Sequence, residues 1–222
     1  MRKEIEQYLP LLKSSVLFSF EDDKQIYDAL DLLEPEILIY DKGDFIHRSY
    51  EPMKKFGFVL SGAVHVCSDD IDGNRIIMAE VQPGFTFGES ICYLGIESYP
   101  VYAVSFVDTS VLWLSVKELY SNVADETVNE MQKRFTSLLA SRTLAMNSRI
   151  QILSKLSIRE KLLEYFNVLS SVSKNKEFIV PFNREDMATF IGVNRTALSR
   201  ELSKMKNEGL IEFKKNHFKL IR

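Results

Sequence analysis

The sequence is poor in the residue types that metal sites, redox centres and disulfide frameworks require. Its 222 residues include two cysteines, three histidines and one tryptophan. Two cysteines are too few for a disulfide framework or for an iron–sulfur cluster held by four thiolates. No apolar run reaches the roughly 18 residues that a membrane-spanning helix needs. These absences predict a cytoplasmic protein without a bound cofactor.

Motifs of catalysis are also missing. The chain contains no P-loop, no Gly-x-Ser-x-Gly and no His-Glu-x-x-His sequence, the patterns that present phosphate-binding loops, serine nucleophiles and zinc ligands. The enzyme hypothesis that remains is a small β-barrel with a catalytic metal, which needs clustered histidines and carboxylates. His47, His65 and His217 form no such cluster in the sequence. We therefore expect a protein that is not an enzyme and holds no metal.

Charge is distributed unevenly along the chain, although the formal net charge is only −3. Residues 1–153 contain 14 Lys and Arg against 23 Asp and Glu, a net charge of −9, whereas residues 154–222 contain 14 against 8, a net charge of +6. A basic C-terminal third behind an acidic body is typical of a polyanion-binding module attached to another domain. The pattern favours nucleic acid as a partner, and chance is the alternative.

Residues 35–116 are rich in β-branched and aromatic residues and predict a small all-β domain. Sequences rich in Gly, Asp, Asn and Pro separate the expected strands. The strands are expected at residues 37–40, 56–60, 63–68, 75–81, 102–107 and 110–114. Many short strands at this spacing suggest a barrel, a roll or a sandwich.

Neither glycine nor proline occurs from Glu126 to Leu153. About 28 residues in a helix span roughly 40 Å. A first stripe of side chains, expected to make a dimer contact, consists of Met131, Phe135, Leu138, Arg142, Ala145, Arg149 and Ile152. A second stripe beside it consists of Leu139, Met146, Ile150 and Leu153. Such a wide face predicts a helix that covers its own β-domain and pairs with a second copy; a core helix in a monomer is the alternative.

Residues 183–209 carry the pattern of a helix-turn-helix. Asn183 and Asn194 are the expected N-caps of two short helices, Gly192 permits the turn between them, and Gly209 ends the second helix. The residues that follow alternate apolar and polar around Lys-Lys-Asn-His, which predicts a β-hairpin wing. A helix-turn-helix places its second helix in the major groove of DNA, whereas a generic helical hairpin with a basic face is the alternative.

The exposed side chains of the second helix and of the wing suit contacts with DNA. Arginine pairs with guanine through two hydrogen bonds, whereas lysine and asparagine can hold phosphates, which position the protein without reading sequence. The residues expected near the bases are Arg195, Thr196, Ser199 and Arg200. Those expected near phosphates are Asn194, Lys204 and Lys206, with Lys214, Lys215 and His217 at the wing tip.

Taken together, these features resemble the cyclic-AMP receptor protein/FNR (Crp/Fnr) family of bacterial transcription regulators. The resemblance rests on the long helix, on the winged helix-turn-helix with its sequence GVNRTALSREL, and on the Phe-Gly-Glu sequence at residues 87–89. It rests also on the spacing of Gly43, Gly62, Gly73, Gly84 and Gly88. It implies an α+β chain with a jelly-roll-like β-roll effector domain (double-stranded β-helix) at 1–125, a dimerisation helix at 126–154 and a winged helix-turn-helix domain at 155–222.

The same resemblance implies the partners. They are a second copy of the chain, a pseudo-palindromic DNA operator, RNA polymerase and a small effector. By position, Arg184 begins the first helix of the DNA-binding motif and is expected to contact DNA. Thr196 stands where the best-known members have an acidic residue. The DNA half-site sequence of those members therefore cannot be carried over to this chain.

The nucleotide pocket of this family uses a Gly-Glu pair and, later in the chain, an Arg-Ser or Arg-Thr pair that binds the cyclic phosphate. Gly88 and Glu89 match the first pair, but Tyr99-Pro100 stands at the second. No Lys or Arg occurs from residue 76 to residue 116. Because a buried phosphate needs charge-assisted partners, we expect an effector other than cyclic AMP.

A small apolar or aromatic effector is the remaining hypothesis, held between the β-roll and the long helix. Its expected contacts are Phe87, Gly88, Glu89, Ile91, Tyr93, Tyr99, Tyr102, Arg142, Leu144 and Ala145. The alternatives are a regulator that responds to cyclic nucleotides and one whose filled pocket responds to nothing. Haem binding and thiol sensing by Cys92 are further alternatives, although an inert buried cysteine is the commoner case.

Overall fold

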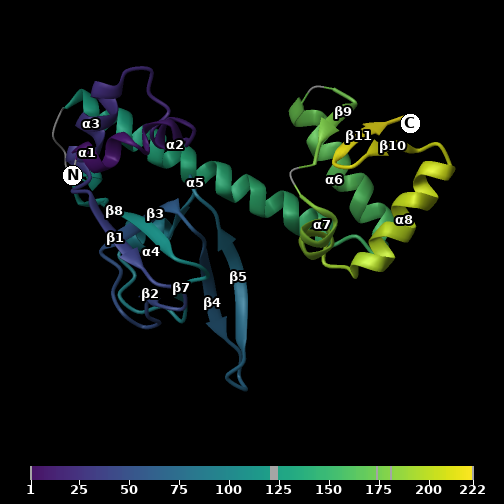
Figure 1. Cartoon of the computed structure of the whole chain (residues 1–222), viewed down its shortest axis with the longest axis horizontal. Helices are drawn as coiled ribbons and strands as arrows, with labels where there is room; N and C mark the ends of the chain where they lie inside the picture. The colour runs from purple at the N-terminus through teal and green to yellow at the C-terminus, as the bar shows by residue number, and fades with distance from the viewer. Residues whose placement is uncertain (1, 121–124, 174, 181, 222) are drawn as a thin grey trace. The chain divides into compact units, whose positions relative to one another are not determined.

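The structure is a computed structural model that describes residues 2–120, 125–173, 175–180 and 182–221 (Figure 1). Its internal contacts divide the chain into two compact units, Met1–Leu139 and Ala140–Arg222. The division falls inside the long helix rather than before it, because the first half of that helix packs into the core of the first unit. Residues 121–124, which the expected effector domain includes, lie outside the described part.

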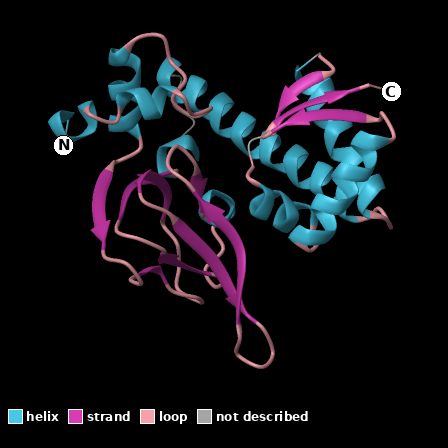
Figure 2. Cartoon of the chain, turned by 45° about the vertical axis from the view of Figure 1, so that its right-hand side comes forward, coloured by secondary structure: helices cyan, strands magenta, loops and turns pink. Residues whose placement is uncertain are grey.

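Two four-stranded antiparallel sheets form the β-roll of the first unit (Figure 2). The first sheet has the order β1 (Glu36–Tyr40), β8 (Thr109–Ser115), β3 (Lys55–Ser61) and β6 (Thr86–Phe87). The second sheet has the order β2 (Phe45–His47), β7 (Tyr102–Ser105), β4 (Val64–Asp69) and β5 (Arg75–Val81). The predicted β-roll is confirmed. The two shortest strands, β2 and β6, were not predicted, because so few residues show no periodic pattern.

An aromatic pair fills the space between the two sheets. The rings of Phe87 and Trp113 meet edge to face, with their centroids 5.5 Å apart. Gly57 allows this packing, since a Cβ at that position would lie 2.2 Å from two carbons of the Phe87 ring. The other buried members of this cluster are Ile46, Val59, Val64, Val81, Ala103 and Val111. The interior of the roll is therefore a packed apolar core.

A layer of helices covers the opposite face of the first sheet. It contains α1 (Arg2–Glu6), α2 (Leu9–Lys13), α3 (Asp23–Leu32) and the first half of α5 (Glu126–Leu153), beside α4 (Glu89–Leu94) and the short 3₁₀ helix η1 (Lys117–Tyr120). Phe56 and Phe58 of β3 and Leu112 of β8 are buried in this core together with Met131 and Phe135 of α5. The bounds of α5 agree with the prediction from its missing glycine and proline.

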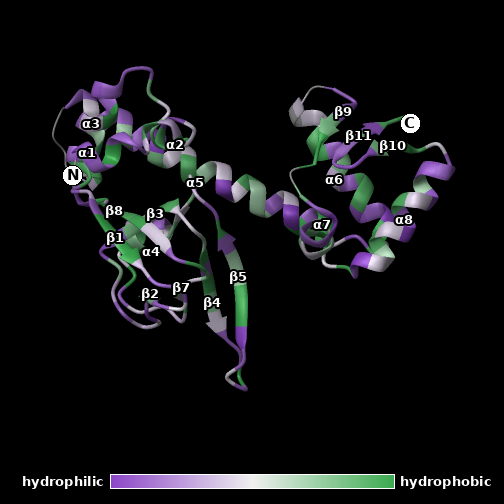
Figure 3. Ribbon diagram, in the orientation of Figure 1, coloured by the Kyte–Doolittle hydropathy of each residue, from purple (hydrophilic) through white to green (hydrophobic). Residues whose placement is uncertain are grey.

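Strand β5 is largely apolar, as its green colour in Figure 3 shows, and it differs from its neighbours because these residues are exposed. Ile76, Ile77 and Met78 are 47–54% exposed. Their continuous apolar run is typical of a buried strand, but β5 lies at the edge of its sheet and only β4 pairs with it among the described strands. An apolar edge strand of this kind leaves backbone and side chains available for pairing.

The second unit joins the last turns of α5 to a small helical domain with a three-stranded sheet. Its elements are α6 (Ile158–Ser173), β9 (Glu177–Ile179), α7 (Arg184–Ile191), α8 (Arg195–Asn207), β10 (Ile211–Lys214) and β11 (His217–Leu220). The sheet has the order β10-β11-β9. The core of this unit includes Ile152 of α5, Leu198 of α8 and Phe218 of β11. Among the described residues of both units, no helix has the length and apolar character that crossing a bilayer requires.

Gly57→Ala is expected to destabilise the β-roll by about 1–3 kcal/mol, because the added methyl group overlaps the Phe87 ring. Phe87→Ala alone is expected to cost about 3–5 kcal/mol through the cavity it leaves. The double variant is expected to cost less than the sum of the two, since the methyl group then enters vacated space. Denaturant unfolding followed by the fluorescence of Trp113 measures all three. If the loss of unfolding free energy in the double variant equalled the sum of the two single losses, the packing described would be contradicted.

Candidate functional site

The helix-turn-helix of the second unit is built by two asparagine caps and one glycine. The side chain of Asn183 accepts hydrogen bonds from the backbone N–H groups of Glu185 and Asp186, at 2.8 and 3.0 Å. Gly192 adopts a φ of 70° and ends α7, a conformation that favours glycine. The side chain of Asn194 accepts from the N–H of Thr196 at 2.8 Å and begins α8. Both predicted caps and the turn are confirmed.

Helix α8 buries one face and exposes the other. Leu198, Leu202 and Met205 are buried in the core of the unit. The exposed side chains are Arg195, Thr196, Ser199, Arg200 and Lys204, as the periodicity of the sequence predicted. Exposed donors on one face of a capped helix match the geometry of a recognition helix.

The two arginines of this face have different surroundings. Arg195 lies 3.6 Å from a carboxylate oxygen of Glu185, and both side chains are more than 60% exposed, so this ion pair contributes little. Arg200 forms no ion pair with any described residue. Its guanidinium group is therefore available to a DNA base without first breaking a contact.

The predicted wing is a hairpin of β10 and β11, paired in register from Ile211 with Leu220 to Lys214 with His217. Lys214, Lys215 and His217 are exposed around its turn. Lys215 has a φ of 57°, in the left-handed region that a lysine seldom adopts.

Arg184 was predicted to contact DNA. In the structure its side chain makes contacts within the second unit. It is half-buried, and its guanidinium carbon lies 5.1 Å from the ring centroids of both Phe213 and Phe218. Its Nη2 donates to the backbone carbonyl of Lys215 at 3.1 Å. Burial lowers the pKa of Arg184. The pattern of the wing could have indicated these contacts, since Phe213 and Phe218 lie on its inward face.

Several residues of the predicted dimer stripe are buried within the single chain. Met131 and Phe135 belong to the core of the first unit and are at most 1% exposed. Ile152 belongs to the core of the second unit. These three side chains present no surface to a partner, and the reason is that the helix contributes to both cores. Leu138 and Arg142 are half-buried, and Ala145 is exposed.

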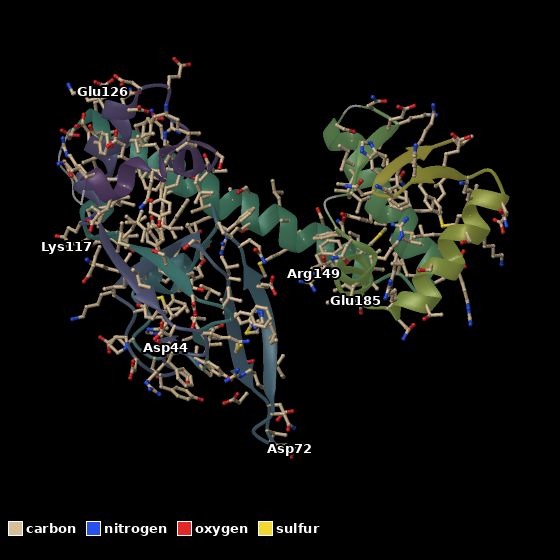
Figure 4. The ribbon with its side chains drawn as sticks, viewed as in Figure 1. Asp44, Asp72, Lys117, Glu126, Arg149 and Glu185 are labelled. Atoms are coloured by element: carbon tan, nitrogen blue, oxygen red, sulfur yellow. The ribbon has the colours of Figure 1, made fainter. Side chains whose placement is uncertain are left out.

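Arg149, another member of that stripe, also interacts within the second unit. Its guanidinium carbon lies 5.5 Å from the ring centroid of Phe190 on α7, and Figure 4 labels it near the end of α5. The neighbouring second stripe is more exposed: Met146 is 65%, Ile150 61% and Leu153 39% exposed. Leu139 of the same stripe packs against the core of the first unit, so the exposed apolar part of the second stripe is Met146, Ile150 and Leu153.

In the first unit, the predicted effector turn is the start of a short helix. Gly88 has a φ of 77° and lies at the N-cap of α4, and Glu89 follows with 1% exposure. The sulfur of Met53 lies 2.2 Å from where a Cβ of residue 88 would stand. A side chain at residue 88 would require Met53 to move, and the positive φ itself favours glycine.

The predicted effector contacts do not all line one cavity. Tyr102 packs with Cys67 and Val104, on the face of β7 opposite to Ala103, which belongs to the cluster of Phe87. The Tyr102 hydroxyl donates to Asp69 at 2.7 Å. Strand alternation in the sequence could have separated Tyr102 from Phe87. The contact of each residue with an effector remains a prediction.

The remaining tyrosines lie in two further places. Tyr93 stacks on Tyr120, with centroids 5.0 Å apart, and lies 5.3 Å from the ring of Phe135. Tyr99 is 44% exposed, and its carbonyl accepts a hydrogen bond from the N–H of Tyr50. Ile91 is half-buried on α4.

Arg142, Leu144 and Ala145 belong to the second unit, where Leu144 is 68% exposed. Their contribution to an effector site remains a prediction.

Both cysteines are buried and reduced. The thiol of Cys92 donates to the carbonyl of Lys54 at 3.2 Å. Burial raises the pKa of Cys92 to about 11, and burial also raises the pKa of Cys67. A thiol that stays protonated at neutral pH is a poor nucleophile, which supports a packing role for both.

Comparisons with known proteins agree with this architecture. The sequence model described as "Cyclic nucleotide-binding domain" matches residues 37–125, and the model described as "Crp-like helix-turn-helix domain" matches residues 158–222. Together they cover more than half of the chain. An effector-type β-roll followed by a winged helix-turn-helix defines a DNA-binding transcription regulator. The chain belongs to the Crp/Fnr family of such regulators, whose members act on transcription rather than as enzymes.

Individual relatives show how far the similarity reaches. Electron transport regulator A of Shewanella oneidensis is 26% identical over 201 residues, which cover 86% of this chain and 75% of that protein. The crystal structure of DNR from Pseudomonas aeruginosa is 20% identical, covers 99% of this chain and 95% of its own, and superposes with a TM-score of 0.52. CprK in complex with OCPA is 17% identical over 89% of each chain, with a TM-score of 0.63. The structural matches show a shared fold.

Thiol reagents are expected to react slowly with the native protein near neutral pH and rapidly after unfolding. A pKa raised from about 9 to about 11 lowers the thiolate fraction of Cys92 about a hundredfold, and the rate is expected to increase only as the pH approaches 11. Absorbance after addition of an aromatic disulfide measures the rate, and Cys67→Ser and Cys92→Ser separate the two thiols. Fast labelling of Cys92 at pH 7 would support a sensing thiol instead.

Proposed function

We propose that the protein acts as a homodimer in the cytoplasm and binds a pseudo-palindromic DNA operator through α8 of each copy. The observation that carries this proposal is the exposed face of α8, with Thr196, Ser199 and Arg200 on its first turns. The net charge of +6 over residues 154–222 supports attraction to DNA. The lysines of the wing tip supply phosphate contacts, which fix the orientation of α8 in the groove.

The dimer contact follows the second stripe of α5 rather than the first. Met146, Ile150 and Leu153 recur at spacings of four and three, which places them on one side of the helix. They are apolar and exposed in the single chain, so pairing with the same stripe of a second copy removes their surface from water. Two copies joined in this way present two recognition helices to two half-sites. RNA polymerase is then the partner through which bound dimers affect transcription.

The effector of this regulator is a small apolar or aromatic molecule rather than cyclic AMP. The interior of the roll contains Phe87 and Trp113, and no cation stands at Tyr99-Pro100 to bind a phosphate. A half-exposed stack of Tyr93 on Tyr120 beside Phe135 offers planar apolar surface, which suits an aromatic ring.

A second candidate is a regulator that needs no effector. It is favoured by the packing around Gly57 and Gly88, where Phe87 and Met53 fill the space that a ligand would need. In that case the chain binds DNA whenever it is dimeric, and its concentration alone sets the response.

Arg200→Ala is expected to relax base preference at one position of each half-site, with a loss of about 1–3 kcal/mol for the preferred base, because a bidentate contact with guanine disappears. Binding of duplexes that vary at each operator position measures this effect. Lys204→Ala is the matched control on the same helix, expected to weaken all sequences alike. Equal weakening of all sequences by Arg200→Ala would show that Arg200 contacts phosphate instead.

Ile150→Glu is expected to shift the protein from dimer to monomer, since it buries an unpaired charge in the proposed contact. Sedimentation at micromolar protein concentration measures the change. Asn147→Glu adds the same charge at an exposed polar position of α5 and is expected to remain a dimer. If Ile150→Glu stays dimeric with a normal thermal unfolding profile, the contact lies elsewhere.

A further inference from the structure

Two backbone carbonyls at the wing tip accept hydrogen bonds from other parts of the second unit. The carbonyl of Lys215 accepts a hydrogen bond from Nη2 of Arg184 at 3.1 Å, and the carbonyl of Asn216 accepts one from the N–H of Val180 at 2.9 Å. Lys215 and Asn216 are the two residues between β10 and β11. The first donor lies on α7, the helix that precedes the recognition helix, and the second donor follows β9 in the chain.

Arg184 is the first residue of α7, and its guanidinium group contacts the wing. Its carbon lies 5.1 Å from the ring centroids of Phe213 on β10 and Phe218 on β11. The Nη1 atom lies 3.8 Å from the sulfur of Met187. A planar guanidinium can stack on aromatic rings and donate in its own plane at the same time, which an ammonium group cannot do.

The backbone at the wing tip depends on this arrangement. Lys215 has a φ of 57°, a conformation that is unfavourable for a non-glycine residue and persists only where its surroundings hold it. The same conformation directs the Lys215 carbonyl toward Arg184, while its side chain is exposed. The carbonyl of Lys215 is thus held by Arg184, while the side chains of Lys214 and Lys215 are exposed.

We propose that Arg184 is a positioning residue that holds the basic wing tip for phosphate binding, and that it does not itself contact DNA. The inference rests on the proposed DNA-binding function of the same unit. Its guanidinium group already contacts both wing rings and the Lys215 carbonyl in the free protein, whereas no contact of Arg200 with another described side chain is of this kind.

The competing role for Arg184 is a direct phosphate contact, and the two roles predict different salt dependence. Each phosphate that a cation neutralises adds about 0.9 to the slope of log affinity against log salt concentration. If Arg184 contacts phosphate, Arg184→Ala and Lys215→Ala lower the slope equally. If Arg184 positions the wing, Arg184→Ala lowers it about twice as much as Lys215→Ala does, because Lys214 and Lys215 both lose their phosphates.

The variants are compared by titrating full-length protein at several salt concentrations with a duplex that the wild type has selected from a randomised library. Arg184→Lys retains the charge but not the planar group, so it is expected to behave like Arg184→Ala. Adding Arg184→Ala to the Lys214→Ala/Lys215→Ala double variant is expected to change nothing further, since the contacts it supports are already gone. Base preference is expected to keep its order in every variant.

A second measurement needs no DNA. Trypsin cleaves after lysine, and its rate at Lys214 and Lys215 in the free protein reports how firmly the wing tip is held. Arg184→Ala is expected to raise this rate several-fold. Lys206→Ala is the matched control, since its ammonium lies 5.2 Å from the ring centroid of the same Phe213 but it donates to no wing carbonyl in the described structure.

The proposal is overturned if Arg184→Lys binds like wild type, if the triple variant loses a further phosphate contact, or if wing cleavage is unchanged. Failure of the wild-type protein to select any DNA sequence would contradict the proposed function instead. In that event the cleavage rates still decide whether Arg184 holds the wing.

Discussion

The structure depends on one helix that contributes side chains to two separate cores. Met131 and Phe135 of α5 are buried with the N-terminal helices and the first sheet, and Ile152 is buried with the DNA-binding unit. Burial of side chains of this size contributes about 1.5–3 kcal/mol each. A change that moves either end of α5 must therefore disturb a packed core or move that core with it. This constraint makes the helix a physical connection between an effector domain and a DNA-binding domain.

The shared use of α5 also explains which of its faces remains for a second copy. Met131, Phe135 and Ile152 of the first stripe are buried in the two cores, and Arg149 contacts Phe190. The second stripe, at Met146, Ile150 and Leu153, stays exposed. Apolar residues left in water on a long helix are a cost that pairing removes, so the monomer's own packing selects the surface proposed for the dimer.

Much of the fold follows from local sequence, and the exceptions have physical reasons. Residues 75–81 and 126–153 were predicted with their observed bounds, because apolar content and the absence of helix breakers are local signals. The caps Asn183 and Asn194 were predicted for the same reason. Strands of two or three residues, such as β6, carry no period. Periodicity also shows that α5 has two apolar stripes without showing which one the N-terminal helices cover.

The residues of the candidate site also divide into those whose position the local sequence predicts and those whose contacts depend on tertiary structure. The exposed face of α8 follows from the helical period, because Leu198, Leu202 and Met205 fix which side is buried. The burial of Arg184 does not, because it requires the wing to fold back until Phe213 and Phe218 reach α7. Tertiary structure thus gives Arg184 contacts within the chain that its position in the sequence does not indicate. Tyr102 shows the reverse case, since strand alternation alone separates it from Phe87.

Selection of DNA from a randomised duplex library, with and without cyclic AMP, tests the central claim most directly. The account predicts one enriched inverted repeat whose half-site centres lie about 34–36 Å apart, or a multiple of that distance, along the helix axis. It predicts the same enrichment in both arms, because residues 76–116 contain no Lys or Arg to bind a cyclic phosphate. Failure to enrich a repeat, or enrichment only when cyclic AMP is present, would contradict it.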